Sequence, residues 1–198
     1  MSRIVGLTGG IACGKSAVSN QLRDRGALII DADQIAREVL APNSEGLARV
    51  VARWGDEVLN AEGALDRPRL GALVFGKSEE RRALEAITHP LIAALSAQRI
   101  SEALAQESPL VIYDAALLIE AGRADQFRPL VVVTTTSVIQ RDRLMARDGL
   151  TLEDAQARVD AQLPLAHKEQ LADHLITNDG DWSALERQVD VLWSALVS

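Results

Sequence analysis

Short runs of apolar residues recur along this chain, and the gaps between them are long enough to hold helices. The runs are rich in Leu, Ile and Val and carry polar residues mainly at their ends, which is typical of strands buried in a parallel sheet. Strands that alternate with helices in this way predict an α/β fold, a five-stranded parallel sheet with helices on both faces. The predicted strands are Ile4–Thr8, Ala27–Asp31, Leu110–Asp114, Leu130–Thr134 and Leu175–Thr177.

Helical spacing follows the first strand and closes the chain. Ala17–Arg25 places Val18 and Leu22 four residues apart and is followed by Gly26, a common helix stop. A last helix is predicted to begin near Asp181. Its apolar stripe is expected to belong to the core and consists of Trp182, Leu185, Val189, Leu192, Trp193 and Leu196.

The long interval 34–108 shows no strand pattern and reads as a helical module inserted into a single domain of residues 1–198. Its helical segments are Ser44–Trp54, Pro68–Phe75 and Leu91–Ala105, and Asn43-Ser44 is suited to cap the first. His89 before Pro90 is expected to mark a helix start, because proline restricts the residue that precedes it.

A second excursion, residues 137–165, is predicted to form an arginine-rich helical hairpin after the fourth strand. Its first helix is Ser137–Asp148, which Gly149 ends. Thr151 is expected to cap the second helix, with Asp154 at the position of a capping box.

The turn after the first strand carries the strongest chemical signal. Gly9-Gly10-Ile11-Ala12-Cys13-Gly14-Lys15-Ser16 fits G-x-x-x-x-G-K-[ST], the phosphate-binding P-loop, with no mismatch. Glycines let successive backbone N–H groups face an anion, and the helix N-terminus adds partial positive charge. Lys15 is expected to reach the β- and γ-phosphates of a nucleoside triphosphate, and the Ser16 hydroxyl to ligate Mg²⁺. Cys13 is interpreted as a small filler and not as a nucleophile.

The composition of the chain limits the kinds of molecule and environment that we expect for it. The 198 residues carry a net charge of −7, which argues against broad nucleic-acid binding. One cysteine excludes an internal disulfide framework, and no apolar run approaches the roughly 20 residues that span a bilayer. With the first strand so close to Met1, no signal peptide is expected, and we predict a cytoplasmic protein with no membrane contact and no obligate protein partner. The histidines show no metal-ligand spacing.

Carboxylates at the ends of two strands are further candidates. Asp31 and Asp33 would share one side if the second strand continued past Asp31, and one could accept a proton from an attacking hydroxyl. Spacing alone leaves an equal alternative, in which Asp33 caps a helix that starts at Gln34. Asp114 ends an apolar strand, as the aspartate that holds the magnesium shell does in P-loop enzymes. Glu120 is either a more remote carboxylate of the site or a surface residue.

The arginine-rich hairpin allows two interpretations. Gln140, Arg143 and Arg147 lie on one helical stripe, and Arg158 and Gln162 form a matching pair on the next helix. Guanidinium groups on such an excursion suit the charge of a transferring phosphoryl group. Alternatively, they form a solvated face that pairs with neighbouring aspartates, which is the commoner outcome for a charged stripe.

With these motifs in place, the chain resembles the dephospho-CoA kinase family over nearly its full length. The resemblance rests on five segments beyond the general P-loop pattern. They are Leu7-Thr8-Gly9-Gly10-Ile11 leading into Gly14-Lys15-Ser16, Asp31-Ala32-Asp33-Gln34-Ile35-Ala36-Arg37, Thr88-His89-Pro90-Leu91-Ile92, Gln140-x-x-Arg143-x-x-x-Arg147-Asp148, and Ile176-Thr177-Asn178.

The resemblance implies a nucleoside-monophosphate-kinase-like P-loop fold, in which 34–108 is a CoA-binding insertion and 137–165 a lid. It implies transfer of the ATP γ-phosphate to the ribose 3′-hydroxyl of dephospho-CoA, with Mg²⁺ as cofactor. The implied catalytic residues are Asp33, Lys15, Arg143 and Arg147. The implied ATP-binding residues are Gly10, Ile11, Ala12, Cys13, Gly14, Lys15, Ser16 and Asn178. Asp31, Arg37, His89, Leu117 and Glu120 would bind the acceptor, and Ser16 and Asp114 the metal.

One position departs from the family pattern. The family typically has Pro-Leu-Leu, an apolar residue and Glu after the third strand, whereas this chain has Ala116-Leu117-Leu118-Ile119-Glu120. Alanine loosens the local backbone of this segment. A nucleoside monophosphate kinase or another small-molecule kinase of the same fold remains the alternative. A GTPase switch is disfavoured, because the chain has neither a D-x-x-G segment nor an Asn-Lys pair.

Overall fold

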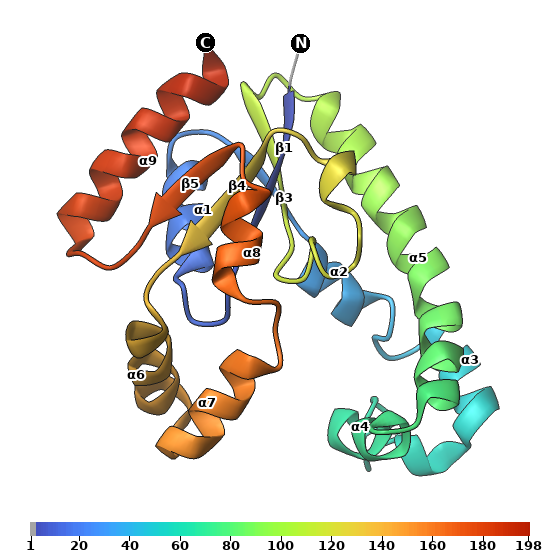
Figure 1. The fold of residues 1–198 in the computed structure, drawn as a ribbon. Coiled ribbons are helices and arrows are strands. Elements are labelled where there is room, and N and C mark those ends of the chain that lie inside the picture. The colour runs from blue at the N-terminus through green and yellow to red at the C-terminus, as the bar shows by residue number, and fades with distance from the viewer. Residues whose placement is uncertain (1–2) are drawn as a thin grey trace. The chain divides into compact units, whose positions relative to one another are not determined.

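The computed structural model describes residues 3–198 and contains a five-stranded sheet (Figure 1). The strand order is β2-β3-β1-β4-β5, and the pairs β1–β3, β1–β4 and β4–β5 are parallel. The five predicted strands are thus confirmed, with ends that shift by at most one residue. The bounds are β1 Arg3–Gly9, β2 Leu28–Asp31, β3 Leu110–Asp114, β4 Leu130–Thr134 and β5 His174–Thr177.

The register of the sheet places the C-terminal ends of β1, β3 and β4 side by side. Leu7 of β1 lies beside Asp114 of β3, and Gly9 lies beside Val133 of β4. Every residue of β3 and of β4 is buried, as their continuous apolar sequences predict. The turns that follow β1, β3 and β4 therefore start from one edge of the sheet, where ligands bind in open α/β folds.

Helix α1 (Lys15–Asp24) and helix α9 (Trp182–Val197) contribute to the same hydrophobic core as β1, β3, β4 and β5. Leu185, Val189, Leu192 and Leu196 of α9 are buried there, as the stripe predicts. Trp182 is different, because 61% of it is exposed. Asp181 caps α9 by accepting a bond from the Ala184 amide at 2.8 Å, so Trp182 falls in the first turn, at the end of the packed stripe.

The chain forms two compact units, one made of residues up to Ile30 together with Ala103–Ser198, the other of Asp31–Glu102. The second unit is helical, apart from an isolated antiparallel bridge between Leu59 and Leu65. Asp31, Ser44 and Asp66 cap three of its helices with their side chains. Its elements are α2 Ala32–Glu38, α3 Glu45–Trp54, η1 Asp56–Val58, α4 Arg67–Val74 and α5 Ser78–Leu104, which continues into the first unit.

Pro90 does not mark a helix start, so that prediction is wrong. It lies inside α5, a helix of 27 residues that begins at Ser78. Proline cannot donate to the carbonyl of Ala86, four residues earlier, which normally costs about 3 kcal/mol. Ala86 and Pro90 are both exposed, so water can bond that carbonyl. The helix continues through the turns before and after Pro90, so the proline removes one backbone hydrogen bond from a helix of 27 residues.

The predicted hairpin is present in the first unit and extends from the end of β4 (Figure 1). Helix α6 (Ser137–Asp148) ends at Gly149, which adopts the left-handed conformation at φ 66°. Helix α7 (Leu152–Asp160) begins with Thr151, whose hydroxyl accepts from the Asp154 amide. A short helix not predicted from the sequence, α8 (Leu165–Gln170), then returns to β4. The described residues contain no helix long and apolar enough to cross a membrane.

Candidate active site

The P-loop lies between β1, which ends at Gly9, and α1, which begins at Lys15. This is the strand–loop–helix order that the motif requires. Gly14 has φ 89°, and a side chain there would collide with the amide group of Asn178, so only glycine fits. The Gly14 carbonyl accepts from the amides of Ala17 and Val18, which starts the helix directly behind the loop.

Lys15, the first residue of α1, forms an ion pair with Asp114 at the end of β3. The two side chains are 16% and 6% exposed, so the pair is shielded from water on most sides. Ser16 stands next to it in the first turn of α1 and is exposed. A cation, a carboxylate and a hydroxyl are thereby gathered at the mouth of the loop.

Two glutamines from the hairpin region hold the backbone of Ile11. Gln140 of α6 donates from its amide to the Ile11 carbonyl at 2.7 Å, and its side chain is almost fully buried. Gln162, just after α7, accepts from the Ile11 amide, also at 2.7 Å. The P-loop is therefore fixed on both sides of one residue by side chains more than 120 positions away in sequence, since the separations are 129 and 151.

Arg143 and Asn178 cover the next part of the loop. The Arg143 guanidinium donates to the carbonyls of Ala12, Cys13 and Asn178 at 3.3, 3.4 and 3.0 Å. The buried Asn178 amide donates to the Cys13 carbonyl at 2.8 Å. Two residues expected to bind ATP or its phosphates thus lie against the P-loop.

Arg147 does not contact the P-loop, unlike Gln140 and Arg143 on the same helical stripe. It is exposed and pairs with Asp148 at 2.8 Å, and Arg158 bonds the same carboxylate at 2.8 Å. The hydrogen bond from Arg147 and the nearby Arg158 charge lower the pKa of Asp148. The stripe is therefore divided, because Gln140 and Arg143 contact the P-loop while Arg147 forms the solvated charge pairing that the alternative interpretation expects.

Cys13 is completely buried beside Gly10. Burial, the largest influence, raises the pKa of its thiol to about 11, although the nearby Lys168 and Arg143 charges act in the opposite direction. The thiol therefore stays protonated at neutral pH, in agreement with its interpretation as a filler and not a nucleophile.

The reactivity of Cys13 follows from this pKa. At pH 8, about 0.1% of a thiol with a pKa near 11 is ionised, against roughly a quarter of an ordinary cysteine. Alkylation of the native protein by iodoacetamide should therefore be at least about 100-fold slower than alkylation of the urea-unfolded chain. The native rate should increase as the pH rises toward 11. Mass spectrometry of timed samples measures both rates, and equal rates would contradict the buried position of the thiol.

The segment after β3 is held to β1 despite the alanine at position 116. The Thr8 hydroxyl donates to the Ala116 carbonyl at 3.1 Å, and the Ala115 amide donates to the Leu7 carbonyl at 3.0 Å. These two bonds connect the segment after β3 to β1. Leu117 is half exposed. The Glu120 carboxylate pairs with Lys168 of α8 at 2.6 Å, so it is not the free surface carboxylate of the alternative interpretation.

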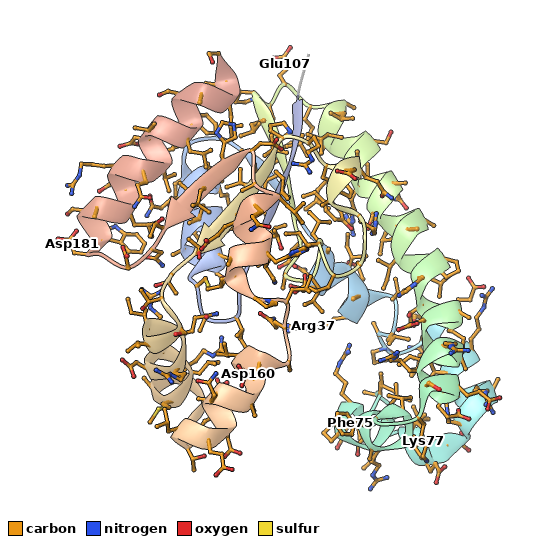
Figure 2. The ribbon with its side chains drawn as sticks, in the orientation of Figure 1. Arg37, Phe75, Lys77, Glu107, Asp160 and Asp181 are labelled. Atoms are coloured by element: carbon orange, nitrogen blue, oxygen red, sulfur yellow. The ribbon has the colours of Figure 1, made fainter. Side chains whose placement is uncertain are left out.

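The remaining predicted residues belong to the helical unit. Asp31 is the N-cap of α2 and accepts from the Gln34 amide at 2.9 Å, so Asp33 is not the cap. Because β2 ends at Asp31, strand alternation does not relate the two carboxylates, and that premise is wrong. Asp33 is exposed in the first turn of α2, and Arg37, labelled in Figure 2, is exposed near its last turn. His89 is exposed in α5.

A cavity of about 460 Å³ adjoins the P-loop within the first unit. Its wall includes Gly10, Thr135, Gln140, Gln162 and Glu169, so the loop, α6, α8 and the end of α7 all contribute. Apolar side chains such as Val159, Leu163 and Leu165 complete the wall, and the cavity therefore offers a ligand both apolar contact and hydrogen bonds close to the loop.

Sequence reasoning missed Lys168, whose side chain is fully buried and lies 3.4 Å from the Gly9 carbonyl. It has no motif around it, and a lysine in a short helix is usually a surface residue. Its contacts depend on how the chain returns from the hairpin to the sheet. No pattern of local spacing could have identified it.

This P-loop on a parallel sheet, with a lysine–aspartate pair at its mouth and an arginine from a helical hairpin above it, defines a P-loop kinase. Residues 3–184 match the sequence model of one family, described as dephospho-CoA kinase, and the chain belongs to that family.

Individual relatives agree over the full length. A dephospho-CoA kinase of Geobacter sulfurreducens is 44% identical over 96% of this chain and 97% of its own length. The crystal structure of TT1252 from Thermus thermophilus superposes with a TM-score of 0.85 at 32% identity, and covers 100% of this chain and 99% of its own. A dephospho-CoA kinase from Campylobacter jejuni gives a TM-score of 0.72 at 28% identity, with 100% and 98% covered.

Proposed function

We propose that this protein phosphorylates the ribose 3′-hydroxyl of dephospho-CoA with ATP and releases CoA and ADP. The observation that carries the proposal is the end-to-end match with dephospho-CoA kinases, which includes the P-loop, the insertion and the hairpin. A long helical insertion is not needed for the donor site alone, so we assign acceptor binding to 34–108 and the lid to 137–165.

The donor half of the reaction belongs to the P-loop. Gly10, Ile11, Ala12, Cys13 and Gly14 would surround the phosphates, and Lys15 would balance the charge of the γ-phosphate. Two of these residues use their amides within the protein, because the Ile11 amide donates to Gln162 and the Cys13 amide to the Gly10 carbonyl, so these two amides would have to exchange partners when ATP binds. Arg143 would add charge from the lid, and Asn178 would lie near the adenine. Positioning and charge account for most of the catalysis in phosphoryl transfer, so these contacts carry the rate.

Ser16 and Asp114 fit a magnesium ion. Their hydroxyl and carboxylate are the hard oxygen donors that Mg²⁺ prefers, and one or two protein ligands suffice because water and phosphate complete its shell. Asp114 pairs with the Lys15 ammonium, and Ser16 is the next residue of α1 after Lys15. When bound, Mg²⁺ neutralises charge on the β- and γ-phosphates.

On the acceptor side, we propose Asp33 as the general base that takes the proton of the 3′-hydroxyl. Its exposure and the capping role of Asp31 leave the Asp33 carboxylate available for this task. Arg37 and His89 would contact the anionic acceptor, with Asp31 and Leu117 beside it. For Glu120 no direct contact is proposed, because Lys168 already holds its carboxylate.

Release of ADP from ATP with dephospho-CoA as acceptor tests the function. Dephospho-CoA should give a rate at least about 100-fold above the nucleoside monophosphates in parallel reactions, since a site built for one acceptor leaves polar groups unpaired with another. Preference for a nucleoside monophosphate would replace this proposal with the kinase alternative. GTP binding with slow hydrolysis and no dependence on an acceptor would contradict both.

We further propose a cytoplasmic protein with ATP and dephospho-CoA as its ligands. A lone, buried cysteine suits a reducing compartment. The net charge of −7 does not suit nucleic acid, and the proposal includes no membrane or obligate protein partner.

Arg147 provides a test of the lid. If closure brings its guanidinium from Asp148 to the phosphates, Arg147→Ala should lower kcat by about tenfold or more and change the KM for dephospho-CoA by less than twofold. Steady-state kinetics at saturating ATP separates the two constants. Arg158→Ala, which removes the other arginine on Asp148, is the matched control and should leave kcat within twofold. A rise in KM alone after Arg147→Ala would make this residue an acceptor anchor.

A further inference from the structure

Lys168 is completely buried although it carries a charge. Its ammonium lies 2.6 Å from the Glu120 carboxylate and 3.4 Å from the Gly9 carbonyl, the second contact being long for a hydrogen bond. Removing an ammonium from water costs several kcal/mol, and apolar side chains of similar volume often replace a buried ion pair without loss of stability. Packing alone therefore gives no reason for a lysine at this place.

The groups that Lys168 joins belong to the two sides of the site. Gly9 is the last residue of β1 and the first of the P-loop motif. Glu120 lies in the segment that follows Asp114, the partner of Lys15. One buried cation thus connects the start of the phosphate-binding loop with the segment after β3.

The surroundings hold Lys168 in place. The adjacent Glu169 accepts from the Thr134 hydroxyl at 2.5 Å, which ties α8 to the end of β4. Leu165, at the start of α8, packs against the core. Its side chain occupies the place that a side chain at Gly10 would take. Burial raises the pKa of the Cys13 thiol in the loop, and the nearby Lys168 charge acts against this larger effect by lowering the pKa. The cation is therefore both fixed and close enough to act on the loop.

We infer that Lys168 is a positioning residue for phosphoryl transfer, because its ammonium fixes the P-loop at Gly9 relative to the segment after β3 through Glu120. The effect on catalysis rests on the proposed function. The contacts of Lys168 with Gly9 and Glu120 do not depend on it. Glu120 then acts through Lys168 and not by binding the acceptor. Loss of either partner should displace the loop by a small amount, which lowers kcat more than it weakens binding.

A double-mutant cycle tests the coupling. Lys168→Met and Glu120→Gln should each lower kcat by about tenfold and leave the KM for dephospho-CoA within twofold. The double variant should also lose about tenfold, not about 100-fold, because all three variants lack the same pair. Its melting temperature should recover part of the loss seen in Lys168→Met, since no unpaired Glu120 charge remains. Arg25→Met, which removes a surface pair with Asp190, is the control and should keep its kcat.

Two kinetic outcomes would overturn the inference. One is a normal kcat per folded molecule with only a lower melting temperature, which would make the pair purely structural. The other is a rise in the KM for dephospho-CoA in Glu120→Gln alone, which would place that carboxylate on the acceptor.

Hydrogen exchange separates this inference from the proposed function and needs no acceptor. The amides of residues 10–14 should exchange several-fold faster in Glu120→Gln and in Lys168→Met than in the unmodified protein, and unchanged exchange would reject the positioning role. Glu120→Gln supplies this readout if Lys168→Met does not fold. A failure of the unmodified protein to phosphorylate dephospho-CoA would reject the proposed function and leave the exchange result intact.

Discussion

Lys15→Ala should lower kcat/KM by about 10³-fold, the largest loss expected from a single substitution in the loop. Removal of one preorganised charge-stabilising group from a site costs about 10²–10³-fold in kcat, and Lys15 carries a full charge in a place where only 16% of its side chain is exposed. Phosphoryl transfer offers little covalent chemistry to compensate, because the rate depends on position and charge. Coupled detection of ADP at several ATP concentrations measures the effect.

The substitution also removes the lysine partner of Asp114, so folding has to be checked separately. Thermal unfolding of Lys15→Ala should show a single transition, with a melting temperature lowered by a few degrees. Arg23→Ala changes an exposed basic residue in the last turn of the same helix and should keep kcat/KM within twofold. Near-normal kcat/KM in Lys15→Ala would refute the assigned role of the lysine.

Asp33→Asn should reduce kcat by about 10²–10⁴-fold, the contribution of a general base, with little change in the KM for dephospho-CoA. The amide has the shape of the carboxylate but cannot take the proton of the acceptor hydroxyl. Since Asp31 caps α2, the change should shift the free energy of unfolding by less than about 1 kcal/mol. Kinetics at saturating ATP and urea unfolding measure the two effects.

The capping role has its own variant. Asp31→Ala removes the bond to the Gln34 amide and should lower the free energy of unfolding by about 1 kcal/mol. Glu38→Gln alters another exposed carboxylate of α2 and should leave kcat unchanged within twofold. If Asp33→Asn raised only the KM, Asp33 would be a binding residue and the base would have to be sought elsewhere.

Local patterns in the sequence predicted most of the fold. The apolar runs found all five strands, and capping residues such as Thr151 and Asp181 set helix starts to within one residue. These signals work because a cap or a buried strand depends on residues a few positions apart. Pro90 shows the limit, since its local preference for a helix start was overridden by a helix long enough to absorb one missing bond.

The candidate site was predicted unevenly for the same reason. The P-loop is contiguous, so Lys15 and Ser16 followed directly from the motif, and Asp114 from the strand before it. Spacing could not decide whether Asp33 caps the helix or acts as a base, because the two possible helix starts, Ala32 and Gln34, differ by only two residues. Arg143 and Arg147 share one stripe, yet only the path of the hairpin determines which of them meets the P-loop.

The sequence by itself determined that this chain holds a nucleoside triphosphate on a parallel sheet, and its family segments indicated the acceptor. The tertiary structure decided which distant side chains secure that loop. Gln162 and Lys168 contact it across 151 and 159 residues of chain. Contacts of this kind depend on where strands and hairpins return in space, and on burial that removes water from a charge. Neither the path of the chain in space nor the burial of a charge can be read from the spacing of neighbouring residues.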